Sequence, residues 1–379
     1  MGNLIPLNVP FVPDKSKQYV LEALEGNHQQ GDGIFTARVS KMVSDLVGGG
    51  HVLLTPSCTH ALEMASMLAN LGPGDEVIMP SFTFTSAATA VSKFGAIPVF
   101  VDIDMETKGI DVNQVREAIT LKTKAISWVN YAGVAPDLGG LQSVAKEFNL
   151  LLIEDNAHGL GGTYKGKALG SFGDFSTQSF HATKNIQCGE GGALVINNKK
   201  YIDRAEIIRE KGTDRSKFFR GEVNKYQWMD QGSSYLLAES LAAILLGQLE
   251  IFEYIQTKRQ NAFTKYGKID LTDSVSSNII KGFQVSHMFF LQFEKPKDMA
   301  SVKLGLNEKG VGAASHYQPL HLSKFGKQFS NNIPKNSNTT KISSTILRFP
   351  LWPGLTELEL IEVIEKANFE LSLLAKKVI

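Results

Sequence analysis

The chain has 379 residues, of which 43% are hydrophobic and 20% are charged, as is typical of a globular protein with two domains. Its 39 basic and 38 acidic residues leave a net charge of +1, so no basic surplus points to nucleic acid as a partner and no basic tail points to an anionic membrane. Cys58 and Cys188 fit neither a disulfide framework nor a metal site, which favours a reduced, cytoplasmic setting. No secretory signal is recognisable, and no apolar run approaches the ~18 residues of a membrane span.

The first half of the chain alternates between helical and strand-like patterns. Amphipathic spacing predicts helices near residues 13–25 and 35–46, each followed by glycines. From His51 onward, short apolar runs predict strands near residues 51–54, 76–79, 98–101, 125–129, 150–153, 175–178 and 193–196. Helices are predicted between them, near residues 59–70, 83–94, 112–119, 141–148 and 199–211. This alternation predicts an α/β domain with a mainly parallel sheet covered on both faces.

The second half is more polar and its predicted strands are shorter. A long loop is expected over Thr213–Trp228, and a long helix over residues 240–260 leads into a second domain. Strands are then predicted near residues 284–293, 312–317 and 346–351, with a polar loop at 325–340 and a terminal helix at 357–374. We expect a large domain over residues 1–250 and a smaller α/β domain over residues 251–379. The N-terminal segment is expected to pack on the smaller domain.

Two residues carry the chemistry that the sequence suggests most clearly. Lys184 lies in the block Ser179–Asn185, among small and hydroxylated residues, where a lysine can lose its proton near neutral pH and form a Schiff base with a carbonyl. Asp155 ends an apolar strand, and a carboxylate there can keep a pyridine nitrogen protonated. Either residue alone also fits a surface charge or a cap. Together they are the two groups that pyridoxal phosphate (PLP) chemistry needs most.

Further residues suit the other parts of the same cofactor. The segment from Thr55 to Thr59 joins a strand to a helix, and its N–H and hydroxyl groups suit a phosphate, although simple helix capping is an alternative. Phe84 follows the end of the next strand, where it either covers a planar ring or belongs to the core. His158 follows Asp155 by three residues and is placed to bond a phenolic oxygen, or it is structural.

These blocks resemble the DegT/DnrJ/EryC1/StrS sugar aminotransferases, which are fold-type I PLP enzymes, over nearly the whole chain. The resemblance rests on Thr59, Phe84, Asp155, His158 and the block Ser179–Asn185. Other segments are most similar to dTDP-4-amino-4,6-dideoxygalactose transaminases of surface-polysaccharide synthesis, namely Arg209–Ser216, Phe218–Gly221, Asp230–Leu236 and His316–His321. The fold implied is a large domain with a mainly parallel seven-stranded sheet and a smaller C-terminal α/β domain.

The resemblance also implies a role for each candidate. Lys184 would hold the cofactor and move a proton, and Asp155 would pair with the ring nitrogen. His158 would bond the phenolic oxygen, and Phe84 would cover the ring. The phosphate would be held by the backbone of Cys58 with Thr59 and Ser179.

One block departs from the family pattern. The usual Gly-x-Asn-Tyr-Arg is Gly232-Ser233-Ser234-Tyr235-Leu236 here, so Ser234 stands where the family has an asparagine. That asparagine reaches the phosphate of the neighbouring subunit, and this contact is open for Ser234. Because family enzymes act as dimers with shared active sites, a homodimer is expected.

The implied reaction moves the amino group of glutamate to a dTDP-4-keto-6-deoxyhexose. The sugar's pyrophosphate needs cationic partners, for which Lys211, Arg215 and Arg220 are candidates, with a solvated surface charge as the alternative for each. His316, Tyr317 and His321 would touch the sugar or nucleotide, or serve the structure.

Two other functions stay open at this point. Amination at C3 of a 3-keto sugar would use the same cofactor residues, because regiochemistry depends on how the sugar is oriented. A non-catalytic regulator that binds PLP or a sugar nucleotide is disfavoured, because the lysine and the aspartate are both present and no nucleic-acid-binding segment is recognisable. Related PLP-dependent sugar dehydratases carry a histidine at the position of Lys184, so the lysine favours an aminotransferase.

Overall fold

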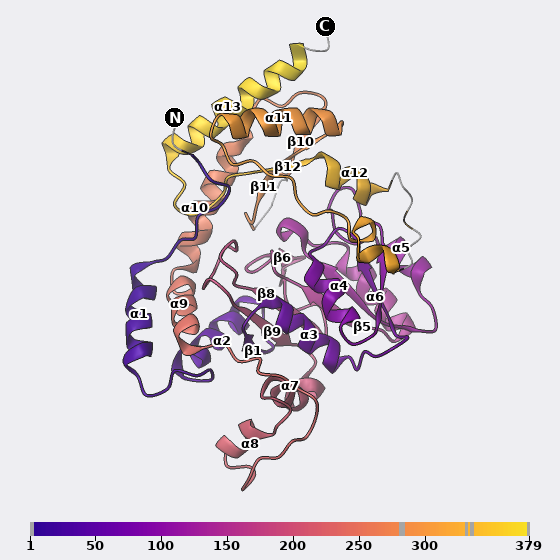
Figure 1. The fold of residues 1–379 in the computed structure, drawn as a ribbon, viewed down its shortest axis with the longest axis vertical. Helices are drawn as coiled ribbons and strands as arrows, with labels where there is room; N and C mark the ends of the chain where they lie inside the picture. Colours follow the sequence, from indigo (N-terminus) through magenta and orange to yellow (C-terminus); the bar gives the residue numbers. More distant parts are fainter. Residues whose placement is uncertain (1–3, 280–284, 330–332, 334–336, 377–379) are drawn as a thin grey trace.

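The structure, a computed structural model, describes residues 4–279, 285–329, 333 and 337–376. A seven-stranded sheet organises the larger, lower part in Figure 1. Its spatial order is β1 (His51–Thr55), β9 (Gly192–Ile196), β8 (Phe175–Ser179), β5 (Leu151–Asp155), β4 (Thr123–Val129), β2 (Glu76–Pro80) and β3 (Ile97–Val101). Strand β9 is antiparallel to both neighbours, and the other pairs are parallel. The predicted α/β fold with a mainly parallel sheet is confirmed.

Helices cover both faces of this sheet, because its strands carry apolar side chains on both sides. One face packs against α3 (Cys58–Leu68), α4 (Thr85–Ser92) and α7 (Ile202–Arg209). The other packs against α2 (Ile34–Leu46), α5 (Val112–Ala118), α6 (Leu138–Phe148) and α9 (Glu239–Leu249). On β1, Leu53 belongs to the first core, whereas Val52 and Leu54 belong to the second, as alternation along a strand requires. Helix α1 (Asp14–Glu25) packs on α9.

The C-terminal part has a core of its own. Its three-stranded antiparallel sheet consists of β10 (Val275–Ser277), β11 (Phe289–Phe293) and β12 (Ile346–Phe349). Helices α10 (Phe252–Lys265), α11 (Pro296–Glu308) and α13 (Glu357–Lys376) pack on it. Ile5 from the N-terminal segment is buried in this core and pairs with Val311. Because the two cores are separate and meet at the junction of α9 and α10, we propose the domain boundary near residue 250.

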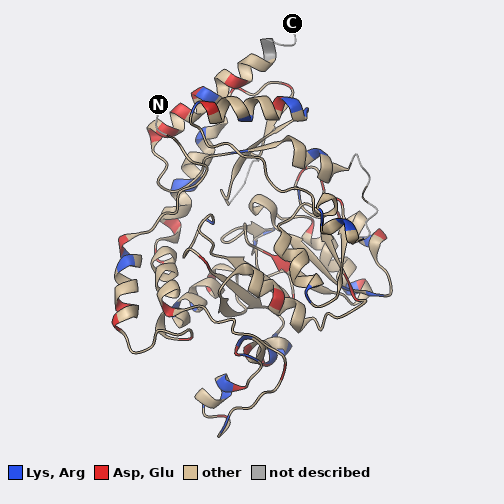
Figure 2. Ribbon diagram, viewed as in Figure 1, with Lys and Arg blue, Asp and Glu red and all other residues tan. Residues whose placement is uncertain are grey.

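Shorter elements complete the described part of the chain. They are the hairpin β6 (Thr163–Tyr164) and β7 (Lys167–Ala168), the helices α8 (Arg215–Phe219) and α12 (Asn338–Thr345), and five 3-10 turns, η1 (Tyr131–Gly133), η2 (Lys199–Tyr201), η3 (Tyr266–Lys268), η4 (Leu320–Leu322) and η5 (Gly326–Gln328). Figure 2 shows both signs of charge spread over the outer helices, with basic residues on the segment of residues 202–228, which we call the α7–α8 extension. Among the described residues, no helix has the length and apolar composition that crossing a membrane requires.

The helix predicted over residues 240–260 is two helices. Ile251, between α9 and α10, has non-helical backbone angles of −114° and 27°. Gly247 lies inside α9, where it makes room for Ser16, and no glycine or proline stands between residues 248 and 260, so no local signal marks the break itself. Phe252 and Ile255 at the start of α10 still pack with α9 in the core of the large sheet, whereas Ala262 and Phe263 near its end belong to the C-terminal core, so α10 runs from one core into the other.

Three predictions in polar segments also differ from the structure. The predicted loop Thr213–Trp228 contains α8, and the predicted strand over 312–317 makes only a single bridge, from Ala314 to Arg348. The predicted loop over 325–340 ends in the start of α12, where Asp102 accepts hydrogen bonds from the N–H groups of Asn338 and Thr339 at 2.9 and 2.8 Å. Of the predicted loop over 325–340, residues 330–332 and 334–336 lie outside the described residues. Of the strand predicted over 284–293, Gln284 lies outside them and β11 begins only at Phe289.

Candidate active site

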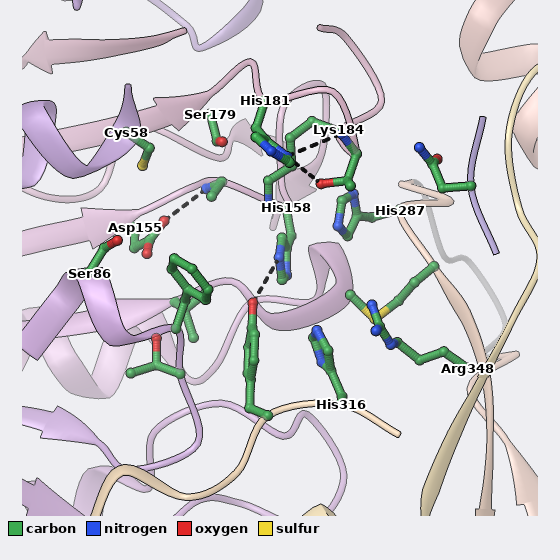
Figure 3. Close-up of a pocket in the computed structure, with 18 of the residues that line it drawn as sticks. Cys58, Ser86, Asp155, His158, Ser179, His181, Lys184, His287, His316 and Arg348 are labelled. Atoms are coloured by element: carbon green, nitrogen blue, oxygen red, sulfur yellow. Dashed lines mark hydrogen bonds between the residues drawn. The ribbon is translucent and has the colours of Figure 1, made fainter. Parts of the chain in front are cut away.

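A cavity of about 670 Å³ lies at the edge of the large sheet where β5 and β8 end, and the C-terminal part forms its opposite wall. Parallel strands bring their carboxyl ends to one edge, which is where ligands bind in such sheets. Asp155 therefore lies beside Thr177 at the end of β5, and Ser179 ends β8 beside Gly192 of β9. Figure 3 shows Asp155, Ser179 and Lys184 on one side of the cavity and Arg348 on the other.

Lys184 and Asp155 line this cavity together, as predicted. The Lys184 side chain is half-buried, and among the described residues its amine has no hydrogen bond or ion pair. Burial lowers the pKa of Lys184, and the negative charge of Asp155 only partly opposes this. Burial also raises the pKa of Asp155, against the opposing effects of the Ala157 N–H and of Lys184. The amine is thus brought toward its neutral, nucleophilic form beside a carboxyl that can pair with a cation.

The start of α3 provides an anion site at one end of the cavity. Ser57 caps the helix by accepting a hydrogen bond from the His60 N–H at 3.2 Å. In the described part of the chain, the N–H groups of Cys58 and Thr59 have no acceptor, as expected for the first turn of a helix. A Cβ added at Gly192 would lie 2.4 Å from the Cys58 nitrogen, so β9 and α3 meet closely only because this residue is glycine. With the hydroxyls of Thr59 and Ser179, this helix start suits a phosphate.

The hydrogen bonds of His158 fix which ring nitrogen carries the proton. The Ala132 N–H donates to Nδ1 at 3.3 Å, so Nδ1 is an acceptor. Burial keeps the pKa of His158 well below its usual value, so the ring is neutral and its proton is on Nε2. Nε2 then donates to the Tyr317 hydroxyl at 3.3 Å. Ala132 has a left-handed φ of 53°, and this backbone conformation belongs to the turn that presents the N–H.

His287 stacks on His158, with ring centroids 4.1 Å apart, and its tautomer is also fixed. The side-chain NH2 group of Gln256 donates to the Leu160 carbonyl at 3.4 Å, so the side-chain oxygen of Gln256 faces Asn185. The NH2 group of Asn185 donates to this oxygen at 3.1 Å. Asn185 then accepts from Nδ1 of His287 at 3.0 Å. Nε2 of His287 is left as an acceptor on the cavity wall. Through these contacts Asn185, which follows Lys184, is joined to α10 and to the C-terminal part of the chain.

Replacing His287 with glutamine is expected to remove a pH-dependent part of the stability. Burial holds the pKa of His287 well below the ordinary 6.5, so the unfolded chain binds a proton in a range where the folded chain does not. The contribution of His287 is therefore fully present above about pH 6.5 and falls by about 1.4 kcal/mol per pH unit as the pH drops below that value. Denaturant unfolding of both proteins from about pH 8 to about pH 5 would measure it. A stability difference that does not vary with pH would contradict the assignment.

Three further candidates lie on the wall nearest the C-terminal domain. Phe84 is 56% exposed and lines the cavity, so it is not a core residue, which supports the ring-covering alternative. The ring centroid of Tyr317 lies 6.1 Å from that of Phe84, and the Tyr317 ring stacks on the His316 ring with centroids 3.7 Å apart. His316 bonds the Tyr131 hydroxyl through Nδ1 at 2.6 Å. His316 and Tyr317 both line the cavity and are only half-buried, so a substrate in the cavity can contact them.

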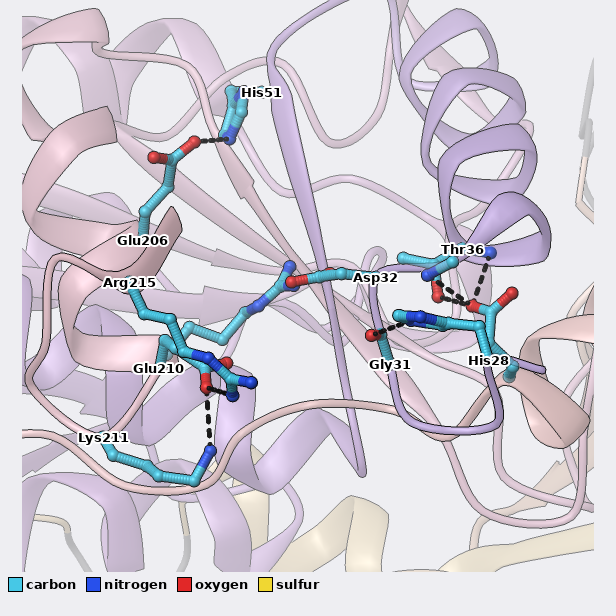
Figure 4. A network of polar contacts seen from close by, with 12 residues as sticks. His28, Gly31, Asp32, Thr36, His51, Glu206, Glu210, Lys211 and Arg215 are labelled. Carbon is cyan, nitrogen blue, oxygen red and sulfur yellow. Dashed lines mark hydrogen bonds and ion pairs between the residues drawn. The ribbon is translucent and has the colours of Figure 1, made fainter. Parts of the chain in front are cut away.

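Five other candidates lie away from the cavity of their own chain. Lys211 and Arg215 both pair with Glu210 at 2.9 Å (Figure 4), and Arg220 pairs with Glu206 and Glu222. Arg215 and Arg220 line a second cavity of about 550 Å³ between the start of α2 and the α7–α8 extension. Ser234 is exposed and bridges to Glu210. His321 is 5% exposed and bonds the Ser81 hydroxyl at 2.6 Å, which is a structural contact.

Sequence reasoning missed His287, Arg259 and Arg348, which line the cavity from the C-terminal part. Arg259 on α10 donates to the carbonyls of Ser286, His287 and Leu351 at 3.0, 2.6 and 3.2 Å. Burial lowers its pKa to about 9, and its partners are all carbonyls. A signal for Arg348 was present, because a single arginine interrupts the apolar run Ile346–Leu351.

Comparison with known proteins gives a family for this architecture. The sequence profile described as the DegT/DnrJ/EryC1/StrS aminotransferase family matches residues 12–368. The chain is 30% identical to the spore coat polysaccharide biosynthesis protein SpsC of Bacillus subtilis, over 96% of each chain.

Solved structures agree with this result. A DegT/DnrJ/EryC1/StrS aminotransferase from Brucella abortus is 28% identical, with a TM-score of 0.84 over 94% of this chain and 95% of that one. The PLP form of Spr1654 from Streptococcus pneumoniae is 25% identical, with a TM-score of 0.88 over 97% and 99% of the two chains.

Proposed function

Because the chain belongs to the DegT/DnrJ/EryC1/StrS aminotransferase family and is a PLP-dependent aminotransferase, we propose that it transfers the amino group of glutamate to a dTDP-4-keto-6-deoxyhexose. The product would be a dTDP-4-amino-4,6-dideoxyhexose of galactose configuration, used in surface-polysaccharide synthesis. Support for this product comes from the segments Arg209–Ser216 and His316–His321, which resemble those transaminases. Support for the pathway comes from the 30% identical SpsC, a spore coat polysaccharide biosynthesis protein.

The observation that carries the proposal is the placement of Lys184 and Asp155 in one cavity. The residues present fit PLP, because an anion site, a buried carboxyl and a weakly basic amine follow one another along the cavity wall. When bound, PLP supplies an aldehyde that takes the amino group and a ring that withdraws electrons from the reacting carbon.

The residues would divide the work as follows. Lys184 binds the cofactor and moves the proton at the reacting carbon, since burial lowers its pKa and so favours the neutral amine that a general base needs. Asp155 holds the ring nitrogen in its protonated form by its opposite charge. His158 donates from Nε2 to the phenolic oxygen, which is the direction that its Ala132 contact dictates. Phe84 covers the ring, and the start of α3 with Thr59 and Ser179 holds the phosphate.

We further propose that two copies form a homodimer in the cytoplasm. Lys211, Arg215, Arg220 and Ser234 lie outside the cavity of their own chain, as residues would that serve the partner's site. The α7–α8 extension also exposes large apolar side chains, with Phe219 69% and Trp228 80% exposed, as a subunit interface does. The pyrophosphate of the sugar nucleotide would meet these cations at the interface. Both cysteines are free, which suits a reducing compartment.

The test is a product analysis with a panel of keto sugars. Purified protein is incubated with glutamate and with dTDP- and UDP-linked 4-keto and 3-keto sugars, and the position and configuration of the new amine are assigned by NMR. We expect amination of the dTDP-4-keto-6-deoxyhexose with an axial C4 amine. Amination at C3 alone would favour the 3-keto alternative. If the protein forms one equivalent of 2-oxoglutarate per bound cofactor but no sugar of the panel gains nitrogen, the acceptor is not a nucleotide sugar of these classes.

A further inference from the structure

Arg348 lies on the cavity wall with most of its hydrogen-bonding groups unused. It belongs to β12, and Figure 3 shows its side chain extending from that wall toward His316. A guanidinium has five N–H donors. Within the described ranges only one nitrogen, Nη2, has an acceptor, the Ser315 carbonyl at 3.3 Å, and the buried Nε has none.

The charge of Arg348 also has no counter-ion among the described residues. Burial lowers the pKa of Arg348, and only the hydroxyls of Tyr131 and Tyr317 oppose this effect. The positive charge of Arg348 in turn lowers the pKa of Lys184, His158, His287 and His316. This side of the cavity is therefore positive, and a desolvated cation without a partner is costly. A bound anion would remove that cost.

The shape of the guanidinium indicates which anion. Its planar fork matches a carboxylate, which it binds through two parallel hydrogen bonds. The phosphate already has a separate site at the start of α3, on the Asp155 side of the cavity. An amino donor such as glutamate carries a carboxylate on the same carbon as the amine that must reach the cofactor where Lys184 would hold it. We propose that Arg348 binds a carboxylate of the amino donor, and this inference rests on the proposed function.

The proposal is tested by measuring the two halves of the reaction separately. Arg348→Gln removes the charge and the fork but keeps an amide. We expect its KM for glutamate to rise about 100-fold in the half-reaction that forms 2-oxoglutarate. The second half-reaction, from protein already loaded with the amino group to the keto sugar, should change less than about twofold. Calorimetry should show an equal rise in the dissociation constant of 2-oxoglutarate, and Arg348→Lys should restore part of the affinity.

Controls separate this proposal from the proposed function. Arg116→Gln makes the same change at an exposed arginine paired with Glu147 at 2.9 Å, and it should alter neither half-reaction. Equal losses in both halves, or a loss only with the keto sugar, would overturn the assignment to the amino donor, and so would unchanged glutamate kinetics in Arg348→Gln. If wild-type protein fails to use glutamate at all, the proposed function itself fails. Circular dichroism of Arg348→Gln and Arg348→Lys verifies that the variants are folded.

Discussion

Lys184→Ala is expected to lower the rate of amino transfer by about 10⁴-fold or more, because the variant loses both the amine that binds PLP and the group that moves the proton. Stability should change little, since the Lys184 amine has no hydrogen bond or ion pair among the described residues. Turnover with glutamate and denaturant unfolding would measure the two effects. A variant that is inactive but fully folded is the expected outcome.

A chemical readout accompanies the kinetics. Borohydride treatment of wild-type protein with PLP should fix the cofactor to one lysine, which mass spectrometry would locate at Lys184. The matched control is Lys122→Ala, which removes an exposed lysine away from the cavity and should leave labelling unchanged. Labelling of Lys184→Ala at a different single site, with retained turnover, would show that another lysine has the assigned role.

Asp155→Asn is expected to slow amino transfer by about 10²–10³-fold, because a neutral amide cannot hold the ring nitrogen in its charged form. The fold should survive, since the new amide oxygen can still accept the 3.0 Å hydrogen bond from the Ala157 N–H. Burial of a charge is also avoided in the variant, so its free energy of unfolding should be unchanged or higher. Single-turnover kinetics with glutamate would follow the step directly. Near-normal rates would show that a different group protonates the ring.

The neighbouring carboxyl on the same strand provides a matched control. Glu154 points to the other face of β5 and accepts hydrogen bonds from the N–H groups of Gly170 and Phe172 at 2.7 and 3.0 Å. Glu154→Gln should therefore lose about 1–3 kcal/mol of stability, because the new NH2 group cannot accept the N–H hydrogen bonds that one carboxylate oxygen accepts, while its rate stays within about tenfold. The pair of variants separates a role in the chemistry from a role in the fold.

Short sequence patterns predicted the strands of the large sheet and the site residues that lie at the ends of those strands. Each apolar run that became a strand is bounded by polar or glycine-rich turns, and strand β5 ends in Asp155 just as its run of Leu151–Ile153 indicated. The start of α3 and the block around Lys184 are equally local. Because parallel strands share an edge, these separate blocks were expected to meet.

Features that depend on distant contacts could not be predicted in the same way. His287 and Arg348 reach the cavity from the C-terminal part, and both lie more than 100 residues after Lys184 in the sequence, so no short pattern records that approach. The start of α12 depends on Asp102, which lies 236 residues before Asn338. The break at Ile251 carries no glycine or proline, and α10 then runs from the core of the large sheet into the C-terminal core, which is a distant contact that no short pattern records.

Helix α10 links the two walls of the active site within a single turn. Gln256 bonds Asn185 beside Lys184, and Arg259, three residues later, holds the carbonyls of His287 and Leu351 on the opposite wall. Inserting one residue between them would rotate these side chains by about 100° relative to each other. A chimaera that exchanges C-terminal domains between relatives must therefore place its junction before Gln256, so that both anchors come from the same parent.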